Sequence, residues 1–264
     1  MTPLLKQSLD RMIEFLSETL GDKLQSVYLF GSVTLDDFRP GWSDIDILCL
    51  TDDTLSEEEA EKLVNARQTL MEQFPDDPFV RSFEGWILSA AELVGDAPIR
   101  AVYWGTKGQK VTQKFTLDVF SRYELIRYGV RVFGPEIRHW LTLPDAQALA
   151  DGVREHYETI RKYAQQTETN LYACGWLLDI ARCIYTLRTG DVIAKTAAGE
   201  WALRENLCPD RGELERTLTI RQDPQAYKNK PETKEWLSSL GPCVQRFADV
   251  LEQELAVFDS AKKA

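Results

Sequence analysis

The sequence is poor in histidine, has no paired-cysteine motif and contains no long apolar run. It has only two histidines, His139 and His156, which argues against a histidine-rich zinc site and against a Ser-His-Asp triad. Its five cysteines stand at no CxxC spacing, which indicates reduced thiols in a cytoplasmic protein. Because no run of about 18 apolar residues occurs, we expect no membrane span. The opening segment MTPLLKQSLDRMIEF favours an amphipathic helix over a signal peptide.

The sequence also lacks an excess of positive charge. It has 31 lysines and arginines against 42 aspartates and glutamates, a net charge of -11 and a pI of about 4.8. Nucleic-acid-binding proteins usually carry a basic surface, so this balance argues against a DNA or RNA substrate. An acidic protein can instead attract a small cationic molecule, although a purely solubilising role explains the charge equally well.

The most informative feature that is present is a pair of aspartates at the start of an apolar run. One apolar run ends at Gly31, and the segment SDID at residues 43–46 opens a second. Successive side chains of a strand point to opposite faces, so Asp44 and Asp46 share a face. Adjacent carboxylates repel each other unless a cation lies between them, and Mg²⁺ commonly takes one or two carboxylates together with nucleotide phosphates. The pattern predicts a magnesium site, and a solvated strand face is the alternative.

Two further features complete this candidate site. Gly31-Ser32 allows a ligand close to the backbone, and a helix starting there would direct free N–H groups at a phosphate. Residues 79–88 alternate like a strand, which would carry Glu84 beside the aspartates if the two strands paired. Glu84 is our candidate general base for a hydroxyl proton, and the alternatives are a third metal ligand or an exposed glutamate.

The chain is long enough for one large or two ordinary domains, with 264 residues of which 44% are hydrophobic. Strand-like and helical patterns mix in the first half, whereas the second half is helical. We therefore expect one domain of residues 1–147 and a helical domain of residues 148–264, in which the apolar segment 171–187 forms a central helix. The other expected elements are helices over 3–20, 54–74, 114–128, 196–203 and 234–258, and strands over 25–30, 43–50, 79–88 and 98–104.

These motifs occur in the order and at the spacing of a known family. In the first half they resemble the signature of the nucleotidyltransferase superfamily, which has the fold of DNA polymerase β. In the second half they resemble the helical domain of the aminoglycoside adenylyltransferases that act at the 3″ and 9 hydroxyls of streptomycin and spectinomycin. The motifs are Gly31-Ser32, Asp37-Phe38-Arg39-Pro40, Ser43-Asp44-Ile45-Asp46, Arg182-Cys183-Ile184-Tyr185-Thr186-Leu187, Gly190-Asp191, Lys195 and Ala197-Ala198-Gly199-Glu200-Trp201-Ala202-Leu203. The resemblance implies an α/β (α+β) nucleotidyltransferase fold with a mixed sheet, followed by an all-α helical bundle domain.

The resemblance also implies roles for individual residues. The implied ATP-binding residues are Gly31, Ser32, Ser43, Arg182, Lys195 and Tyr227. Among these, Arg182 and Lys195 would reach the phosphates. The implied antibiotic-binding residues are Glu168, Tyr172, Trp176 and Asp179. Asp36 stands where the family often has a second glycine, and aspartate tolerates the left-handed backbone that such a turn requires.

The implied activity is Mg²⁺-dependent transfer of AMP from ATP to a hydroxyl of a small cationic acceptor. The acceptor would be an aminoglycoside or aminocyclitol antibiotic of the streptomycin or spectinomycin type, and the reaction would confer resistance. Two alternatives stay open: nucleotidylation of another hydroxyl compound, such as a lincosamide or a metabolite, and a non-catalytic nucleotidyltransferase-like antitoxin that binds a partner. Two domains that share one cleft can work as a monomer, which is the state we expect.

Overall fold

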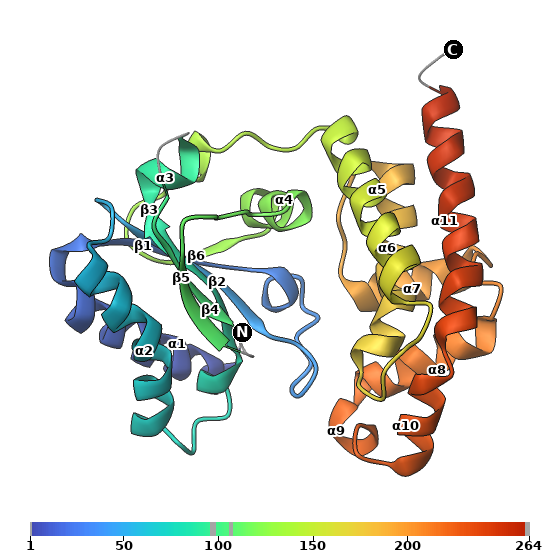
Figure 1. The fold of residues 1–264 in the computed structure, drawn as a ribbon, viewed down its shortest axis with the longest axis horizontal. Helices are drawn as coiled ribbons and strands as arrows, with labels where there is room; N and C mark the ends of the chain where they lie inside the picture. The colour runs from blue at the N-terminus through green and yellow to red at the C-terminus, as the bar shows by residue number, and fades with distance from the viewer. Residues whose placement is uncertain (1, 96–98, 106–107, 262–264) are drawn as a thin grey trace. The chain divides into compact units, whose positions relative to one another are not determined.

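The computed structural model describes residues 2–95, 99–105 and 108–261, which form two compact units (Figure 1). Unit 1 consists of Met1–Phe38 and Ser43–Leu143, and unit 2 consists of Arg39–Trp42 and Pro144–Ala264. Unit 1 combines a sheet with helices and unit 2 is helical, as the predicted fold class requires. The predicted domains, residues 1–147 and 148–264, stay a prediction, because compactness alone does not show that each part folds independently.

The sheet of unit 1 has the strand order β5-β4-β3-β2-β1-β6 within the described residues (Figure 1). β2 and β3 are parallel and the other neighbouring pairs are antiparallel, so the predicted mixed sheet is confirmed. The strands are β1 (Leu24–Phe30), β2 (Ile45–Thr51), β3 (Phe83–Ser89), β4 (Ala101–Gly105), β5 (Gly108–Thr112) and β6 (Val130–Phe133). The strand expected over 98–104 corresponds to β4, and Pro98 lies outside the described residues.

Apolar side chains are buried on both faces of this sheet. The helices of unit 1 are α1 (Pro3–Leu20), α2 (Glu57–Gln73), α3 (Ala90–Val94) and α4 (Val119–Arg127). Val27 and Leu29 of β1 pack in one cluster with residues of α1 and α2, whereas Tyr28 packs in another with residues of α3 and α4. This alternation with a period of two is what a strand buried on both sides produces.

The ends of two helices in unit 1 follow local sequence signals. Gly21 ends α1 with a φ of +58°, as its position after the apolar periodicity predicts. Ser56 and Glu59 form a capping box at the start of α2, in which each side chain accepts a backbone N–H of the other residue. Such a cap contributes about 1 kcal/mol to the stability of a helix.

The start of α4 corrects an expectation. A helix was expected over 114–128, but α4 begins at Val119. The reason is local, because the Asp118 carboxylate accepts hydrogen bonds from the backbone N–H groups of Phe120 and Ser121. An aspartate in this capping position starts a helix and does not continue one.

Unit 2 is built around α6, the helix predicted to be central. Its helices are α5 (Ala146–Tyr163), α6 (Tyr172–Thr189), α7 (Lys195–Arg204), α8 (Arg211–Gln222), α9 (Pro224–Tyr227), α10 (Pro231–Ser238) and α11 (Gly241–Ala261). α6 contacts α5, α7, α8, α10 and α11, which explains why its sequence is apolar almost all round. Gly190 ends it in the left-handed conformation at φ +70°, and α7 begins a few residues later.

The last predicted helix of unit 2 was wrong in one respect. A single helix was expected over 234–258, whereas α10 ends at Ser238 and α11 starts at Gly241. Pro242 accounts for the break, because proline lacks a backbone N–H and is compatible only with the first turn of a helix.

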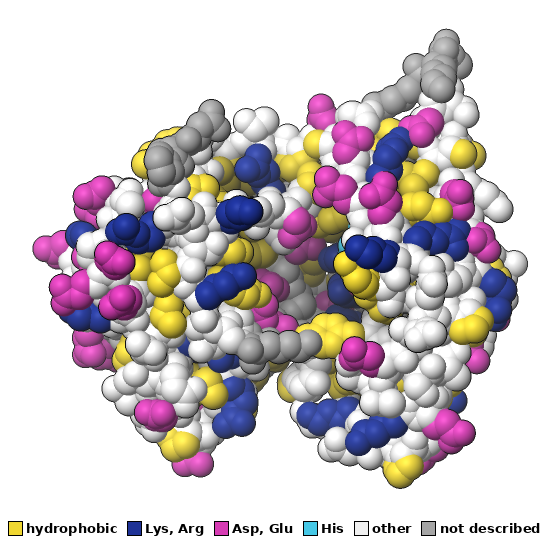
Figure 2. Space-filling view, in the orientation of Figure 1, with side chains coloured by type: hydrophobic (Ala, Val, Ile, Leu, Met, Phe, Trp, Pro, Cys, Tyr) yellow, Lys and Arg dark blue, Asp and Glu magenta, His cyan; other side chains and the backbone are white. Residues whose placement is uncertain are grey.

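Ion pairs connect helices α5 and α11 of unit 2. Acidic and basic side chains are interspersed over α5 and α11 (Figure 2), where Arg154 pairs with Asp259. The Arg161 guanidinium of α5 pairs with both Asp249 and Glu252 of α11. Within the described parts of the chain, no helix has both the length and the apolar character needed to cross a bilayer.

Candidate active site

Strand pairing brings Asp46 and Glu84 side by side in unit 1. β2 and β3 run parallel in a register that pairs Asp46 with Glu84, one position after Ile45 pairs with Phe83. Side chains of paired residues lie on the same face of a sheet, on strands about 4.8 Å apart. Asp44 lies just before β2, and its charge, like that of Glu84, acts on both Arg67 and Tyr103, which places its carboxylate near the same group. All three side chains are half-buried, as expected for groups that meet a ligand at the end of a strand.

Two aspartates, Asp44 and Asp46, are the number and kind of protein ligands that a magnesium ion commonly takes. Among the residues that the structure describes, no group of three His, Cys, Asp or Glu side chains is arranged to hold a metal ion. Magnesium usually takes one or two protein carboxylates and keeps its other positions for water and substrate phosphates. Two aspartates agree with this preference in number and kind, and the metal-binding roles of Asp44, Asp46 and Glu84 all stay predictions.

Glu84 is held by a residue that the sequence did not single out. Tyr103 of β4 donates its hydroxyl hydrogen to Oε1 of Glu84. The Tyr103 ring lies against Trp86, with 4.7 Å between the ring centroids, so the tyrosine is itself fixed by packing. Burial, with a further contribution from the Glu84 carboxylate, raises the pKa of Tyr103, which keeps the hydroxyl protonated as a donor. The short strand predicted over 98–104 was the available signal, but it did not reveal the partner.

A buried arginine lies close to the same carboxylates. Arg67 of α2 is 4% exposed, and its Nε donates to the Phe83 carbonyl at 3.0 Å. Its Nη2 donates to the Arg81 carbonyl, so the guanidinium fixes the backbone that leads into β3. Burial lowers the pKa of Arg67, while the charges of Glu84 and Asp44 oppose that shift. The sequence did not predict this role of Arg67, because only the tertiary fold places α2 next to the start of β3.

Gly31 leaves the space that the Asp46 carboxylate occupies. Its φ is +69°, and a Cβ atom at this position would lie 2.1 Å from Oδ2 of Asp46. A larger residue would therefore clash with the carboxylate and strain the backbone. The predicted helix start at Gly31 is a single 3-10 turn over Gly31–Val33. Ser32 ties this turn to the residue before β2, because its Oγ donates to the Asp44 carbonyl at 3.3 Å.

The loop between β1 and β2 makes the turn that was expected of it. Asp36 adopts a φ of +58°, the left-handed conformation predicted for an aspartate in place of glycine. Ser43, the half-buried residue before Asp44, returns the chain to unit 1.

Four residues of this loop belong to the helical unit. In Arg39–Trp42 the Trp42 ring lies below the Arg221 guanidinium of α8, with 5.0 Å from the carbon of the guanidinium to the ring centroid. Gln225 donates to the Pro40 carbonyl at 3.4 Å. The segment that leads to Asp44 is therefore anchored by residues near α8 and α9, which sequence inspection did not find.

In unit 2 the two predicted phosphate-binding cations meet at one carboxylate. Lys195 Nζ lies 2.8 Å from Oδ1 of Asp179, and Arg182 Nη2 lies 3.6 Å from the same oxygen. His156 of α5 approaches the other oxygen, with 3.9 Å from Nε2 to Oδ2. Burial alone would raise the pKa of the Asp179 carboxyl, but Lys195, His156 and Arg182 outweigh it and hold this pKa well below its usual range. Asp179 is therefore ionised in the folded protein.

The remaining predicted residues of unit 2 are distributed along α6 and α9. Tyr172 and Trp176 lie four residues apart on α6, and Asp179 follows three residues later, so all three share one face. Glu168 precedes α6, where its carboxylate accepts a hydrogen bond from Asn170 at 2.6 Å. Tyr227 ends α9, with the Lys230 ammonium 4.7 Å from its ring centroid.

These two sets of residues can be compared with known proteins. Residues 9–84 match the model of the nucleotidyltransferase domain, and residues 142–254 match that of the aminoglycoside adenylyltransferase C-terminal domain. Spectinomycin 9-adenylyltransferases of Staphylococcus aureus strains Mu50 and N315 are each 22% identical over 201 residues, covering 72% of this chain and 75% of the relative. A crystal structure of spectinomycin adenyltransferase AAD(9) from Enterococcus faecialis with ATP and spectinomycin has a TM-score of 0.64 at 18% identity, covering 94% of this chain and 99% of that one.

The mixed sheet, the pairing of Asp46 with Glu84 and the match over residues 9–84 define a nucleotidyltransferase. The protein is therefore an enzyme, and the alternative of a non-catalytic antitoxin is set aside. With the second match over residues 142–254, the chain belongs to the aminoglycoside adenylyltransferase-like family.

Proposed function

We propose that the enzyme transfers AMP from ATP to a hydroxyl of a spectinomycin-type aminocyclitol in the presence of Mg²⁺. The observation that carries this proposal is the parallel register that sets Asp46 beside Glu84, next to a glycine that leaves room for the Asp46 carboxylate. The names of the relatives support spectinomycin as the acceptor. The assay described below also includes streptomycin, because a streptomycin-type acceptor was predicted as well.

In the proposed reaction the acceptor hydroxyl oxygen attacks the α-phosphorus of ATP. A bond forms between that oxygen and phosphorus, the bond to the β-phosphate oxygen breaks, and pyrophosphate leaves. Glu84 accepts the hydroxyl proton as general base, with Tyr103 holding its other hydrogen-bonding position. Asp44 and Asp46 would hold Mg²⁺, which when bound neutralises phosphate charge and orients the leaving group.

The phosphates of ATP would also meet cations of unit 2. We propose that Arg182 and Lys195 bind them, since a guanidinium makes forked contacts to phosphate and an ammonium acts as a point charge. Gly31, Ser32 and Ser43 would contact the nucleotide from unit 1, and Tyr227 from unit 2.

The cationic acceptor would be recognised by acidic and aromatic groups near the start of α6. Tyr172 is 54% exposed and Glu168 lies close to it in the chain, so a carboxylate and a ring are available to an amine. Trp176 lies one turn further along, with its ring centroid 6.1 Å from that of His156. The acceptor-binding role predicted for Asp179 stays a prediction.

A direct assay tests the proposed reaction. Purified enzyme with ATP and Mg²⁺ is offered spectinomycin, streptomycin and a lincosamide, while pyrophosphate release and the mass of the acceptor are followed. We expect pyrophosphate and an AMP adduct with spectinomycin. The antibiotic assignment would be contradicted if none of the three acceptors raised pyrophosphate release above the rate measured without an acceptor.

The metal-binding pair is tested by Asp46→Ala. We expect a loss of turnover on the order of 10³-fold, because the phosphate charge is no longer neutralised. Asp52→Asn is the matched control, since this exposed aspartate follows the same strand and lies outside the site. Retained turnover in a folded Asp46→Ala protein would refute the proposed site.

We further propose that the enzyme works as a cytoplasmic monomer without nucleic-acid or membrane partners. Two units that supply separate residue sets, with a net charge of -11, support this proposal. Its elution volume in gel filtration tests the monomeric state.

A further inference from the structure

Asp179 is a carboxylate in the interior of the helical unit, where acidic side chains are rarely found. The residue is 9% exposed, and burial of a carboxylate is unfavourable unless it is paired. Its partners come from three helices: Arg182 from α6 itself, Lys195 from the first turn of α7 and His156 from α5. Asp179 therefore links the helices that carry both predicted phosphate-binding cations.

The exposure of these side chains follows their order around the carboxylate. The Asp179 side chain is 12% exposed, that of Arg182 is 17% and that of Lys195 is 32%. The carboxylate thus lies on the inner side, and the ammonium group is the most accessible of the three. Lys195 and Arg182 are the groups of this cluster that a phosphate chain would contact.

Without the carboxylate, the two cations would have no common anchor. The Lys195 side chain has four rotatable carbon–carbon bonds, so its ammonium group can take many positions when nothing fixes it. An ion pair of 2.8 Å with a buried carboxylate fixes the ammonium group in one place. Binding a phosphate chain then requires less ordering of side chains, which favours affinity.

The same contacts argue against Asp179 as a direct ligand of the acceptor. One of its oxygens faces Lys195 and Arg182, and the other faces His156. An acceptor amine would have to displace the Lys195 ammonium to reach this carboxylate, whereas the side chains of Glu168 and Tyr172 are exposed.

We propose that Asp179 is a positioning residue: by pairing with Lys195 and Arg182, it holds both cations in place to bind the triphosphate of ATP. This inference rests on the proposed function, in which those two cations bind ATP. Asp179 itself does not touch the nucleotide or the acceptor. Its effect is confined to phosphate binding.

The test compares Asp179→Asn with Lys195→Ala and with a control, Asp210→Asn. Asp210 lies in the same unit and is paired with Arg246 at 2.8 Å, so its replacement also breaks an ion pair of the helical unit. Affinity for ATP and for inorganic tripolyphosphate is measured by calorimetry, and the KM values of ATP and acceptor by the pyrophosphate assay. Circular dichroism confirms that each variant is folded.

We expect Asp179→Asn to weaken ATP and tripolyphosphate binding on the order of tenfold, as does Lys195→Ala, because a charge-assisted contact to phosphate is misplaced. The KM of the acceptor should stay within about twofold, and Asp210→Asn should bind like the unaltered enzyme. Wild-type affinity of Asp179→Asn for both phosphate ligands would overturn the inference, and so would an equal rise of the two KM values.

The failure of this inference can be distinguished from that of the proposed function. If Lys195→Ala binds ATP normally, the proposed phosphate role of Lys195 fails, and the positioning role of Asp179 fails with it. If Lys195→Ala is weakened but Asp179→Asn is not, only the positioning role fails. Should Asp179→Asn not fold, Asp179→Glu keeps the charge and moves it by one methylene, and weakened tripolyphosphate binding with an unchanged acceptor KM is then the expected result. Wild-type affinity of Asp179→Glu, or failure of both variants to fold, would show a purely structural role.

Discussion

At the scale of single residues, the candidate site depends on side chains that fix other side chains. Tyr103 holds Glu84 in unit 1, and Asp179 holds Lys195 in unit 2. In the roles proposed above, both act through the side chains that they hold. Groups that carry out chemistry work best when their orientation is set before the substrate binds, because less reorganisation is then needed on the way to the transition state.

Replacing Tyr103 by phenylalanine tests the first of these contacts. The change removes the hydroxyl that Glu84 Oε1 accepts from and keeps the packing against Trp86. We expect kcat to fall about tenfold through misplacement of the base, with the KM of ATP nearly unchanged. Steady-state kinetics provide the measurement, and Tyr163→Phe, at a 60% exposed position of unit 2, is the control. A kcat equal to that of the control would show that Glu84 needs no support from Tyr103.

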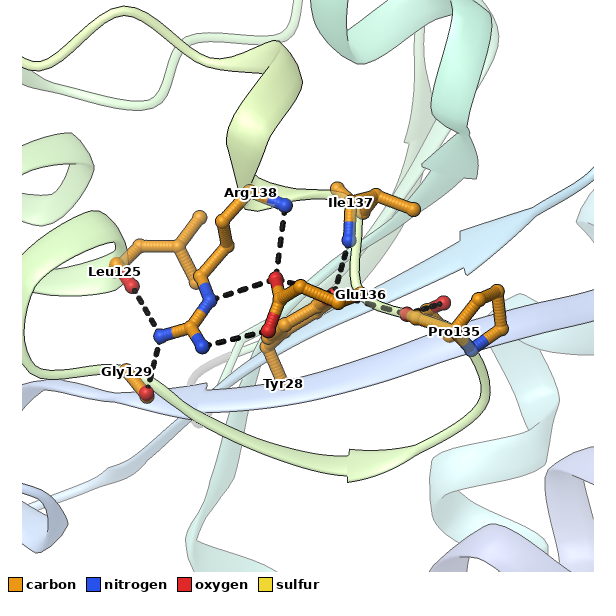
Figure 3. Close-up of polar contacts among 8 residues, drawn as sticks. Tyr28, Leu125, Gly129, Pro135, Glu136, Ile137 and Arg138 are labelled. Carbon is orange, nitrogen blue, oxygen red and sulfur yellow. Dashed lines mark hydrogen bonds and ion pairs between the residues drawn. The ribbon is translucent and has the colours of Figure 1, made fainter.

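At the scale of secondary-structure elements, a polar network fastens the segment after β6 to β1. The Arg138 guanidinium donates to both carboxylate oxygens of Glu136, at 2.8 Å from Nε and 2.6 Å from Nη2 (Figure 3). Glu136 Oε1 also accepts from the Tyr28 hydroxyl at 3.1 Å, and that hydroxyl accepts from the Ile137 N–H at 2.8 Å. Tyr28 is a core residue of β1, so the network joins a surface loop to the sheet.

The network predicts a pH-dependent contribution to stability. Hydrogen bonding from Arg138 lowers the pKa of Glu136 to about 2 from an ordinary value of 4.5. A carboxyl group with a depressed pKa in the folded state stabilises the protein above its unfolded pKa, and this contribution is lost as the pH falls from about 4.5 toward 2. We expect Glu136→Gln to lower the free energy of unfolding by about 1 kcal/mol at pH 7, since the group is partly exposed.

Urea unfolding at several pH values measures this effect. The difference between Glu136→Gln and the unaltered protein should shrink as the pH is lowered from 5 to 3. Glu14→Gln, which lies on α1 away from this network, serves as the control. A difference that is constant across this range would show that the ion pair contributes through packing and not through charge.

At the scale of the whole molecule, ligand binding should report on both residue sets. A ligand that binds only the native state stabilises it by about 2.7 kcal/mol at one hundred times its Kd. We expect ATP with Mg²⁺ to raise the Tm by about 5 °C, and spectinomycin to add a further increase when a non-hydrolysable ATP analogue is present. Thermal-shift measurements with and without EDTA check this, because metal removal should abolish most of the ATP effect. An ATP effect that EDTA leaves unchanged would contradict metal-assisted binding.

Many of the secondary-structure elements could be predicted from short segments of the sequence. The apolar runs that became β1 and β2, the capping residues Ser56 and Gly190, and the apolar α6 were all predictable from local patterns. The errors, at the start of α4 and at the break between α10 and α11, arose where one capping aspartate and one proline overrode a longer periodicity.

The sequence by itself determined the aspartate pair, because a period of two residues fixes which side chains of a strand share a face. It also indicated a turn at Gly31, whereas the fit of this glycine beside Asp46 at a φ of +69° is a contact that the folded structure makes. Only the tertiary structure decided that Glu84 lies beside Asp46 and that Tyr103 donates to Glu84. It also decided that Arg67 binds the backbone before Glu84 and that Asp179 pairs with Lys195 and Arg182. These are contacts between segments far apart in the chain, and they depend on strand register and helix packing, which local periodicity does not specify.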